Sequence, residues 1–140
     1  MNRYLVIFFL FFTWKAALAQ SSEKYNSVYA NFYRAEELFE KQQFGAARKE
    51  FRNFINSFEN PTDPFYIKAL YYEGVSALEL YNNDAVELLE NFNRNYPESI
   101  YRKEIYFRLG KYYYQRKSYK DALAWFNKLK GADVEPSDVE

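Results

Sequence analysis

The sequence predicts an all-α protein, a solenoid in which three pairs of antiparallel helices stack on one another. Apolar residues recur at intervals of three and four along most of the chain, which is the spacing of one face of an α-helix. This pattern occurs three times, with Ala47, Ala85 and Ala122 recurring every 37 or 38 residues. A constant period of this length is typical of stacked helical repeats. Prolines and polar residues interrupt the pattern between copies, where such a fold has its loops.

The first 19 residues predict a cleaved secretory signal peptide. An unbroken apolar run over residues 4–12 follows Arg3, and the segment ends in the small-x-small sequence Ala17-Leu18-Ala19. The run is shorter than the roughly 20 residues that a membrane-spanning helix needs. We therefore expect cleavage between Ala19 and Gln20, export of the chain, and membrane contact only through the signal. The alternative is an uncleaved amphipathic anchor. No cysteine follows the apolar run, which excludes a lipoprotein anchor.

After a polar linker over residues 20–27, the first repeat is expected at about residues 28–61. Helical stripes run through Phe32–Ile55, and the segment QQFG supplies the tight turn between the two helices. The segment ENPTDP, Glu59–Pro64, ends the repeat, because proline is not tolerated in a helix interior. It also precedes the first helix of the next copy.

The second repeat is expected at about residues 67–97 and the third at about residues 103–131. Their inner turns lie in YNND and RKSY, and NYPES, Asn95–Ser99, separates the two copies. Residues 132–140 form a tail in which Pro136 and acidic residues are typical of the start of a further helix. Because the last repeat of a solenoid needs a polar cap, we expect further repeats or self-association at this end.

Small residues predict where the two helices of each pair cross closely, since larger side chains would push the helix axes apart. Each pair cannot bury both of its apolar stripes alone, so the next pair must stack on it. Large apolar and aromatic residues fill the remaining volume. The predicted packing residues are Ala35, Leu38, Ala47, Phe51, Gly74, Ala85, Leu89, Gly110, Tyr113, Ala122 and Phe126.

These positions resemble the tetratricopeptide repeat family. The third copy carries the signature most completely, with Tyr106, Leu109, Gly110, Tyr113, Tyr119, Ala122, Phe126 and Leu129 in order. The resemblance covers about Val28 to Gly131 and is similar to the repeats of bacterial envelope proteins, such as the outer-membrane assembly lipoprotein and the Tol-associated cell-division coordinator. It implies a right-handed α-solenoid, a place in the periplasm or cell envelope of a bacterium, and a scaffold that binds proteins.

The resemblance also implies that the first helix of each pair lines a concave groove. The predicted groove residues are Tyr29, Phe32, Tyr33, Phe39, Lys68, Tyr71, Tyr72, Phe107, Arg108, Lys111 and Tyr114. The same register places Glu36, Val75, Leu78 and Glu104 beside them. Aromatic residues give large contact areas, so we expect a peptide or a partner's helix as ligand. The family's carboxylate clamp uses Lys and Asn where Phe32, Glu36 and Tyr72 stand, and is therefore not expected.

Two alternatives compete with a binding groove. The rings could pack on one another or on a further repeat, which would make the chain a purely structural N-terminal segment of a longer solenoid. More remotely, Glu36, Glu37 and Glu40 could act as the carboxylates of a glycan hydrolase. Acids at this spacing on a helix are far more often a hydrated face, so we expect no enzymatic activity.

Composition limits the chemistry further. The chain has no Cys and no His, which excludes thiolate and imidazole metal sites and the common nucleophile–base pairs, and we expect neither metal nor cofactor. Its formal net charge is +0, which does not favour binding to nucleic acid. The basic residues from Arg102 to Lys120 are interpreted as a solvated helix face; a patch for an acidic partner or anionic lipid is the alternative.

Overall fold

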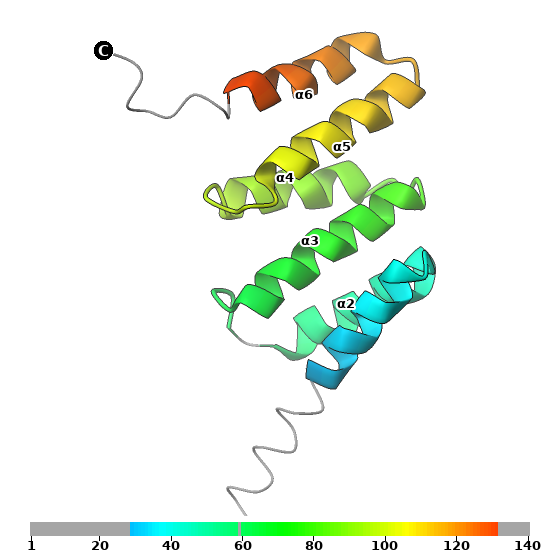
Figure 1. The fold of residues 1–140 in the computed structure, drawn as a ribbon, viewed down its shortest axis with the longest axis vertical. Coiled ribbons are helices and arrows are strands. Elements are labelled where there is room, and N and C mark those ends of the chain that lie inside the picture. The colour runs from blue at the N-terminus through cyan, green and yellow to red at the C-terminus, as the bar shows by residue number, and fades with distance from the viewer. Residues whose placement is uncertain (1–28, 59, 132–140) are drawn as a thin grey trace, which may run out of the picture. The chain divides into compact units, whose positions relative to one another are not determined.

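The computed structural model describes residues 29–58 and 60–131. All regular structure in these residues is helical and none of them forms a strand, so the predicted all-α class is confirmed. The expected signal peptide, cleavage site, linker and C-terminal tail lie outside the described residues. A first helix covers residues 29–40. It is followed by α2 (Phe44–Ser57), α3 (Pro64–Glu79), α4 (Ala85–Asn95), α5 (Arg102–Gln115) and α6 (Tyr119–Gly131), as Figure 1 shows.

The described residues form two compact units, whose boundary falls within α3 between Ala69 and Leu70. The first unit contains the helix over residues 29–40, α2 and the beginning of α3. The second contains the rest of α3 with α4, α5 and α6, and in it α5 packs along α6 (Figure 1). Each unit has a hydrophobic core of its own.

The three turns that join the helices of the expected pairs share one backbone conformation. Gln42, Tyr81 and Lys117 have φ angles of 58°, 55° and 62°, in the left-handed region. The following amides donate to carbonyls five residues earlier: Gln43 to Leu38 (2.9 Å), Asn82 to Ala77 (2.9 Å) and Ser118 to Tyr113 (3.0 Å). This is the Schellman pattern of a helix end. Its occurrence in all three turns extends the repetition seen in the sequence to the backbone.

Helix α3 begins at Pro64 because the preceding residue caps it. The Asp63 Oδ1 atom accepts a hydrogen bond from the amide of Phe65 at 2.8 Å, which satisfies one of the free donors at a helix start. Proline is tolerated in the first turn, where its missing amide hydrogen is not needed. The proline of this segment thus starts the next helix, as predicted, slightly before the expected start of the second repeat at residue 67.

A cluster of phenylalanines forms the core of the first unit. Phe32, Phe51 and Phe54 have no exposed surface. The Phe32 ring centre lies 5.9 Å from that of Phe51, 5.2 Å from that of Phe54 and 5.1 Å from that of Phe65. Edge-to-face and tilted contacts at these distances stabilise aromatic clusters, and burying each ring contributes about 1.5–3 kcal/mol.

Two glycines lie at close helix crossings in the second unit. A Cβ atom on Gly74 would lie 2.6 Å from Cδ2 of Leu89 in α4. A Cβ atom on Gly110 would lie 2.5 Å from Cε1 of Phe126 in α6. No side chain fits at such distances, so the missing side chains allow α3 to approach α4 and α5 to approach α6.

The buried face of α6 differs in part from the one that we predicted. Ala122 is buried as expected, but Phe126 is only half-buried, and so is Tyr113 in α5. Trp125 is buried instead, with its ring centre 5.9 Å from that of Tyr106. Because Trp125 follows Ala122 by three residues, it lies on the same helix face and can fill the core that the shared face encloses.

Candidate functional site

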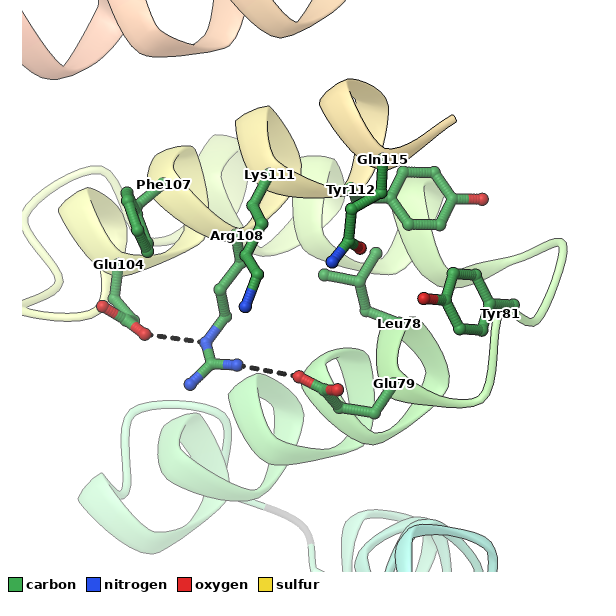
Figure 2. A pocket seen from close by; sticks show the side chains of 9 residues that line it. All are labelled: Leu78, Glu79, Tyr81, Glu104, Phe107, Arg108, Lys111, Tyr112 and Gln115. Atoms are coloured by element: carbon green, nitrogen blue, oxygen red, sulfur yellow. Dashed lines mark hydrogen bonds and ion pairs between the residues drawn. The ribbon is translucent and has the colours of Figure 1, made fainter. Parts of the chain in front are cut away.

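A cavity of about 200 Å³ lies between α3 and α5 in the second unit (Figure 2). The end of α3 and the turn after it contribute Leu78, Glu79 and Tyr81, and α5 contributes Glu104, Phe107, Arg108, Lys111, Tyr112 and Gln115. Pockets that enclose whole small molecules usually measure about 300–1,000 Å³. The size of this cavity therefore suits one or two side chains of a partner better than a cofactor.

The cavity side of α5 follows directly from helical spacing. Glu104, Arg108, Lys111 and Gln115 succeed one another at intervals of four, three and four, which places them on one face. A different face, about 100° around the helix, carries Ile105 and Leu109, which have no exposed surface. The core contacts of α5 therefore hold its polar face towards the cavity.

Arg108 connects α3 with α5 at the edge of the cavity. Its Nη1 atom donates a hydrogen bond to Oε1 of Glu79 at 3.0 Å. Its Nε atom lies 2.8 Å from Oε1 of Glu104, an ion pair without hydrogen-bond alignment. Figure 2 marks both contacts. With its side chain only 28% exposed, Arg108 is largely immobilised by its two carboxylate partners.

The charges around Arg108 keep it protonated. Burial by itself would lower the pKa of its guanidinium, but Tyr71, Glu104 and Glu79 outweigh that effect and raise it. Burial raises the pKa of the Tyr71 hydroxyl, against the opposing effect of Arg108. Arg108 therefore stays a cation and Tyr71 a neutral phenol over the physiological pH range.

Three polar groups of the cavity are free to meet a ligand. Within residues 29–58 and 60–131, the ammonium of Lys111, the amide of Gln115 and the hydroxyl of Tyr81 have no ion-pair or hydrogen-bond partner. In Figure 2, the Gln115 amide and the Tyr81 hydroxyl point towards Leu78, and the Lys111 ammonium lies beside Arg108. All three groups can donate hydrogen bonds.

The predicted groove residues of α5 lie at or near this cavity. Phe107, Arg108 and Lys111 line it, and Phe107 is 49% exposed. Tyr114 is exposed on the same helix but lies outside the lining, with its ring 5.5 Å from that of Tyr119. Tyr72 in α3 is half-buried beside Tyr71.

The predicted groove residues of the first unit are mostly engaged with their neighbours. Tyr29 is half-buried and donates a hydrogen bond to Asp63 at 3.3 Å. Phe39 packs on Phe44. Lys68 forms an ion pair with Glu36 at 2.5 Å. Tyr33 is 55% exposed and is the most accessible of these predicted contact residues in the first unit. The structure thus brings three of the predicted residues, Phe107, Arg108 and Lys111, to the cavity, and the others do not line it.

The prediction that Phe32 and Tyr71 line an open groove is wrong. Phe32 is enclosed by the phenylalanine cluster of the first unit, and Tyr71 is only 5% exposed. The Tyr71 ring stacks on that of Tyr101 with centres 4.2 Å apart and planes 11° from parallel. Val75, expected beside the groove, has no exposed surface either. Phe65 at the start of α3 packs on Phe32, and Tyr101, directly before α5, packs on Tyr71.

Several cavity residues were not found from the sequence, namely Glu79, Tyr81 and Gln115. Gln115 follows Lys111 by four residues, so helical spacing could have indicated it. Glu79 could be recognised only from its contact with Arg108, which is 29 residues away in the chain. Tyr81 reaches the cavity from a turn, where helical spacing no longer applies.

The basic residues from Arg102 to Lys120 have varied surroundings rather than forming one uniform patch. Arg102 donates to the Tyr106 hydroxyl at 2.6 Å and to the carbonyl of Pro97 at 3.0 Å. Arg116 lies over the Tyr112 ring, 5.3 Å from its centre. Together with Arg108 and its carboxylate contacts, these arginines are engaged within the fold.

The acidic cluster of the first helix, Glu36, Glu37 and Glu40, lies at the surface: Glu36 is half-buried, and Glu37 and Glu40 are exposed. A hydrogen bond from Lys41, together with the charge of that residue, lowers the pKa of Glu37, whereas a catalytic acid needs a raised one. Glu36 is occupied by Lys68. In the described part of the chain, no three His, Cys, Asp or Glu side chains gather in a way that could hold a metal ion.

Comparison with known proteins gives no further guide. No protein family, no curated protein and no solved structure matches the chain. None of the helices in the described residues is long and apolar enough to cross a membrane.

Proposed function

We propose that this chain is a non-enzymatic scaffold of the tetratricopeptide repeat type, exported to the periplasm or cell envelope of a bacterium. In this proposal its three antiparallel helix pairs form a right-handed solenoid that binds a peptide or a partner's helix. The three equivalent turns at Gln42, Tyr81 and Lys117 support the repeat. So do the close crossings at Gly74 and Gly110.

The observation that carries the binding function is the cavity between α3 and α5. It combines exposed aromatic surface, at Phe107 and Tyr81, with polar groups that have no partner in the described residues. A side chain that entered it would bury apolar area and form hydrogen bonds at once, which is how anchor residues contribute to peptide affinity. The proposal needs no metal, no cofactor and no nucleic acid.

Peptide binding can be tested with sequences selected from a randomised peptide library displayed against the full chain. We expect Phe107→Ala to weaken the selected peptides by about tenfold or more, because it removes the largest exposed apolar side chain of the cavity. Fluorescence anisotropy with labelled peptides measures the affinity. Leu123→Ala is the matched control, since Leu123 is exposed on α6, outside the cavity. Equal losses in both variants, or no selected binder, would contradict the proposal.

A second candidate function is a purely structural one, as a segment of a longer solenoid. The burial of Phe32, Tyr71 and Val75 favours it, because these predicted contact residues serve the core instead. The exposed Tyr119 and Leu123 on α6 offer apolar surface on which a further helix could pack. If the chain is purely structural, the Phe107→Ala variant and the unchanged chain should bind peptides equally well or equally poorly.

A further inference from the structure

Three hydrogen-bond donors of the cavity have no partner in the described residues, and they indicate what can occupy it. Its two carboxylates, Glu79 and Glu104, both contact Arg108. In the part of the chain that the structure describes, the ammonium of the remaining cation, Lys111, has no hydrogen bond or ion pair, and neither has the amide of Gln115 or the hydroxyl of Tyr81. A hydrogen-bond acceptor on a ligand could therefore bond to these donors without breaking an existing contact.

A positively charged occupant is disfavoured by the same contacts. Arg108 already contacts Oε1 of both Glu79 and Glu104, so a second cation would share these carboxylates with it and would lie close to the like charges of Arg108 and Lys111. A purely apolar occupant would cover Lys111 without satisfying it.

Apolar surface lies on both sides of Lys111. Phe107 stands at one end of the cavity, and Tyr81 and Tyr112 stand at the other, with their ring centres 6.1 Å apart (Figure 2). Leu78, only 6% exposed, lies between Phe107 and the two tyrosines. A peptide that continued in both directions from a central contact at Lys111 could therefore place an apolar residue at each end.

We propose that the cavity binds an Asp or Glu side chain within an extended peptide segment, with an apolar residue on either side of it. The carboxylate accepts hydrogen bonds from Lys111 and Gln115, and the flanking residues pack on Phe107 and on the Tyr81–Tyr112 pair. This inference rests on the proposed function and specifies its ligand. The internal position of the acid distinguishes it from recognition of a chain terminus.

The test begins with the library-selected peptides and measures their binding to the full chain by fluorescence anisotropy. Replacing the central Asp or Glu by Asn or Gln should weaken binding by about tenfold or more, as expected for the loss of a charge-assisted hydrogen bond. Lys111→Gln in the protein should cause a similar loss. The two changes together should cost little more than either alone, because both remove the same contact.

A matched control and three contrary outcomes make the test decisive. Lys49→Gln removes the same charge from an exposed position in the middle of α2 and should leave affinity unchanged. If amidation of the peptide C-terminus abolishes binding while the internal acid is dispensable, the ligand is a terminal carboxylate and the inference is overturned. Selected peptides that lack an acid and tolerate Lys111→Gln, but lose binding with Phe107→Ala, overturn the inference and leave the proposed function intact. Binding that is insensitive to both variants overturns both.

Discussion

At Gly110 the absence of a side chain controls how closely two helices approach. Three atoms of the Phe126 ring would lie between 2.5 and 2.8 Å from a Cβ atom on this residue. The sequence indicated this crossing correctly, since small residues at the same place in successive copies are hard to explain by surface exposure. Gly45, by contrast, has nothing within 4 Å of the corresponding position.

These two glycines give opposite predictions for the same substitution. Gly110→Ala should lower the free energy of unfolding by about 1–3 kcal/mol, because the Phe126 ring must move. Gly45→Ala in α2 should raise it by about 0.5–1 kcal/mol, because alanine favours the helix. Urea unfolding followed by circular dichroism measures both. A loss at Gly45 equal to that at Gly110 would mean that the contact with Phe126 is not the cause.

For the aromatic residues, the type of residue did not indicate which rings are buried and which are exposed. Phe32 and Phe107 are both phenylalanines predicted to face the groove, yet the first has no exposed surface and the second is 49% exposed. The difference lies in their neighbours, since Phe65 covers Phe32, whereas Phe107 remains half-exposed with its ring centre 6.2 Å from that of Phe126. Pairings between distant residues of this kind leave no mark in local spacing.

At the scale of the element, the turns between paired helices are the most regular feature of the chain. Each places a residue other than glycine in the left-handed conformation, at Gln42, Tyr81 and Lys117. This conformation costs an L-residue roughly 1–2 kcal/mol relative to a right-handed one. The Schellman hydrogen bonds of the helix ends offset that cost.

Relieving the strain at one turn should stabilise the protein. Lys117→Gly should raise the free energy of unfolding by about 0.5–1 kcal/mol, since glycine adopts a positive φ without steric cost. Lys49→Gly, in the middle of α2, should lower it by about the same amount, because there glycine opposes the helical conformation. Thermal and urea unfolding of the two variants provide the measurement. Destabilisation by both would show that the turn at Lys117 does not have the conformation described here.

Helix positions were predicted more accurately than helix faces. The predicted breaks coincide with the ends of the helices because Pro64, Pro97 and the polar turns act through local backbone chemistry. On α6, however, Trp125 rather than Phe126 is the buried ring. Both residues lie within about 100° of each other around the helix, and only the position of α5 decides which one is covered.

At the scale of the whole molecule, export remains a prediction from residues 1–19 alone. We expect the chain to reach the periplasm of a bacterial host with Gln20 as its first residue. Mass spectrometry of the exported protein identifies that end. Ala19→Arg should block processing and leave the apolar run attached, because the peptidase requires a small residue at that position. Retention of an intact N-terminus in the unchanged chain would favour an amphipathic anchor instead.

The sequence by itself determined the helical class, the three-fold repetition and the close crossings at Gly74 and Gly110. These properties depend on spacings of three and four residues and on side-chain size, which are local and can be read along the chain. Only the tertiary structure decided which rings are buried, how Arg108 connects Glu79 with Glu104, and where a cavity remains. Those features depend on which residues of neighbouring helices meet, because a helix presents several faces and packing covers only some of them.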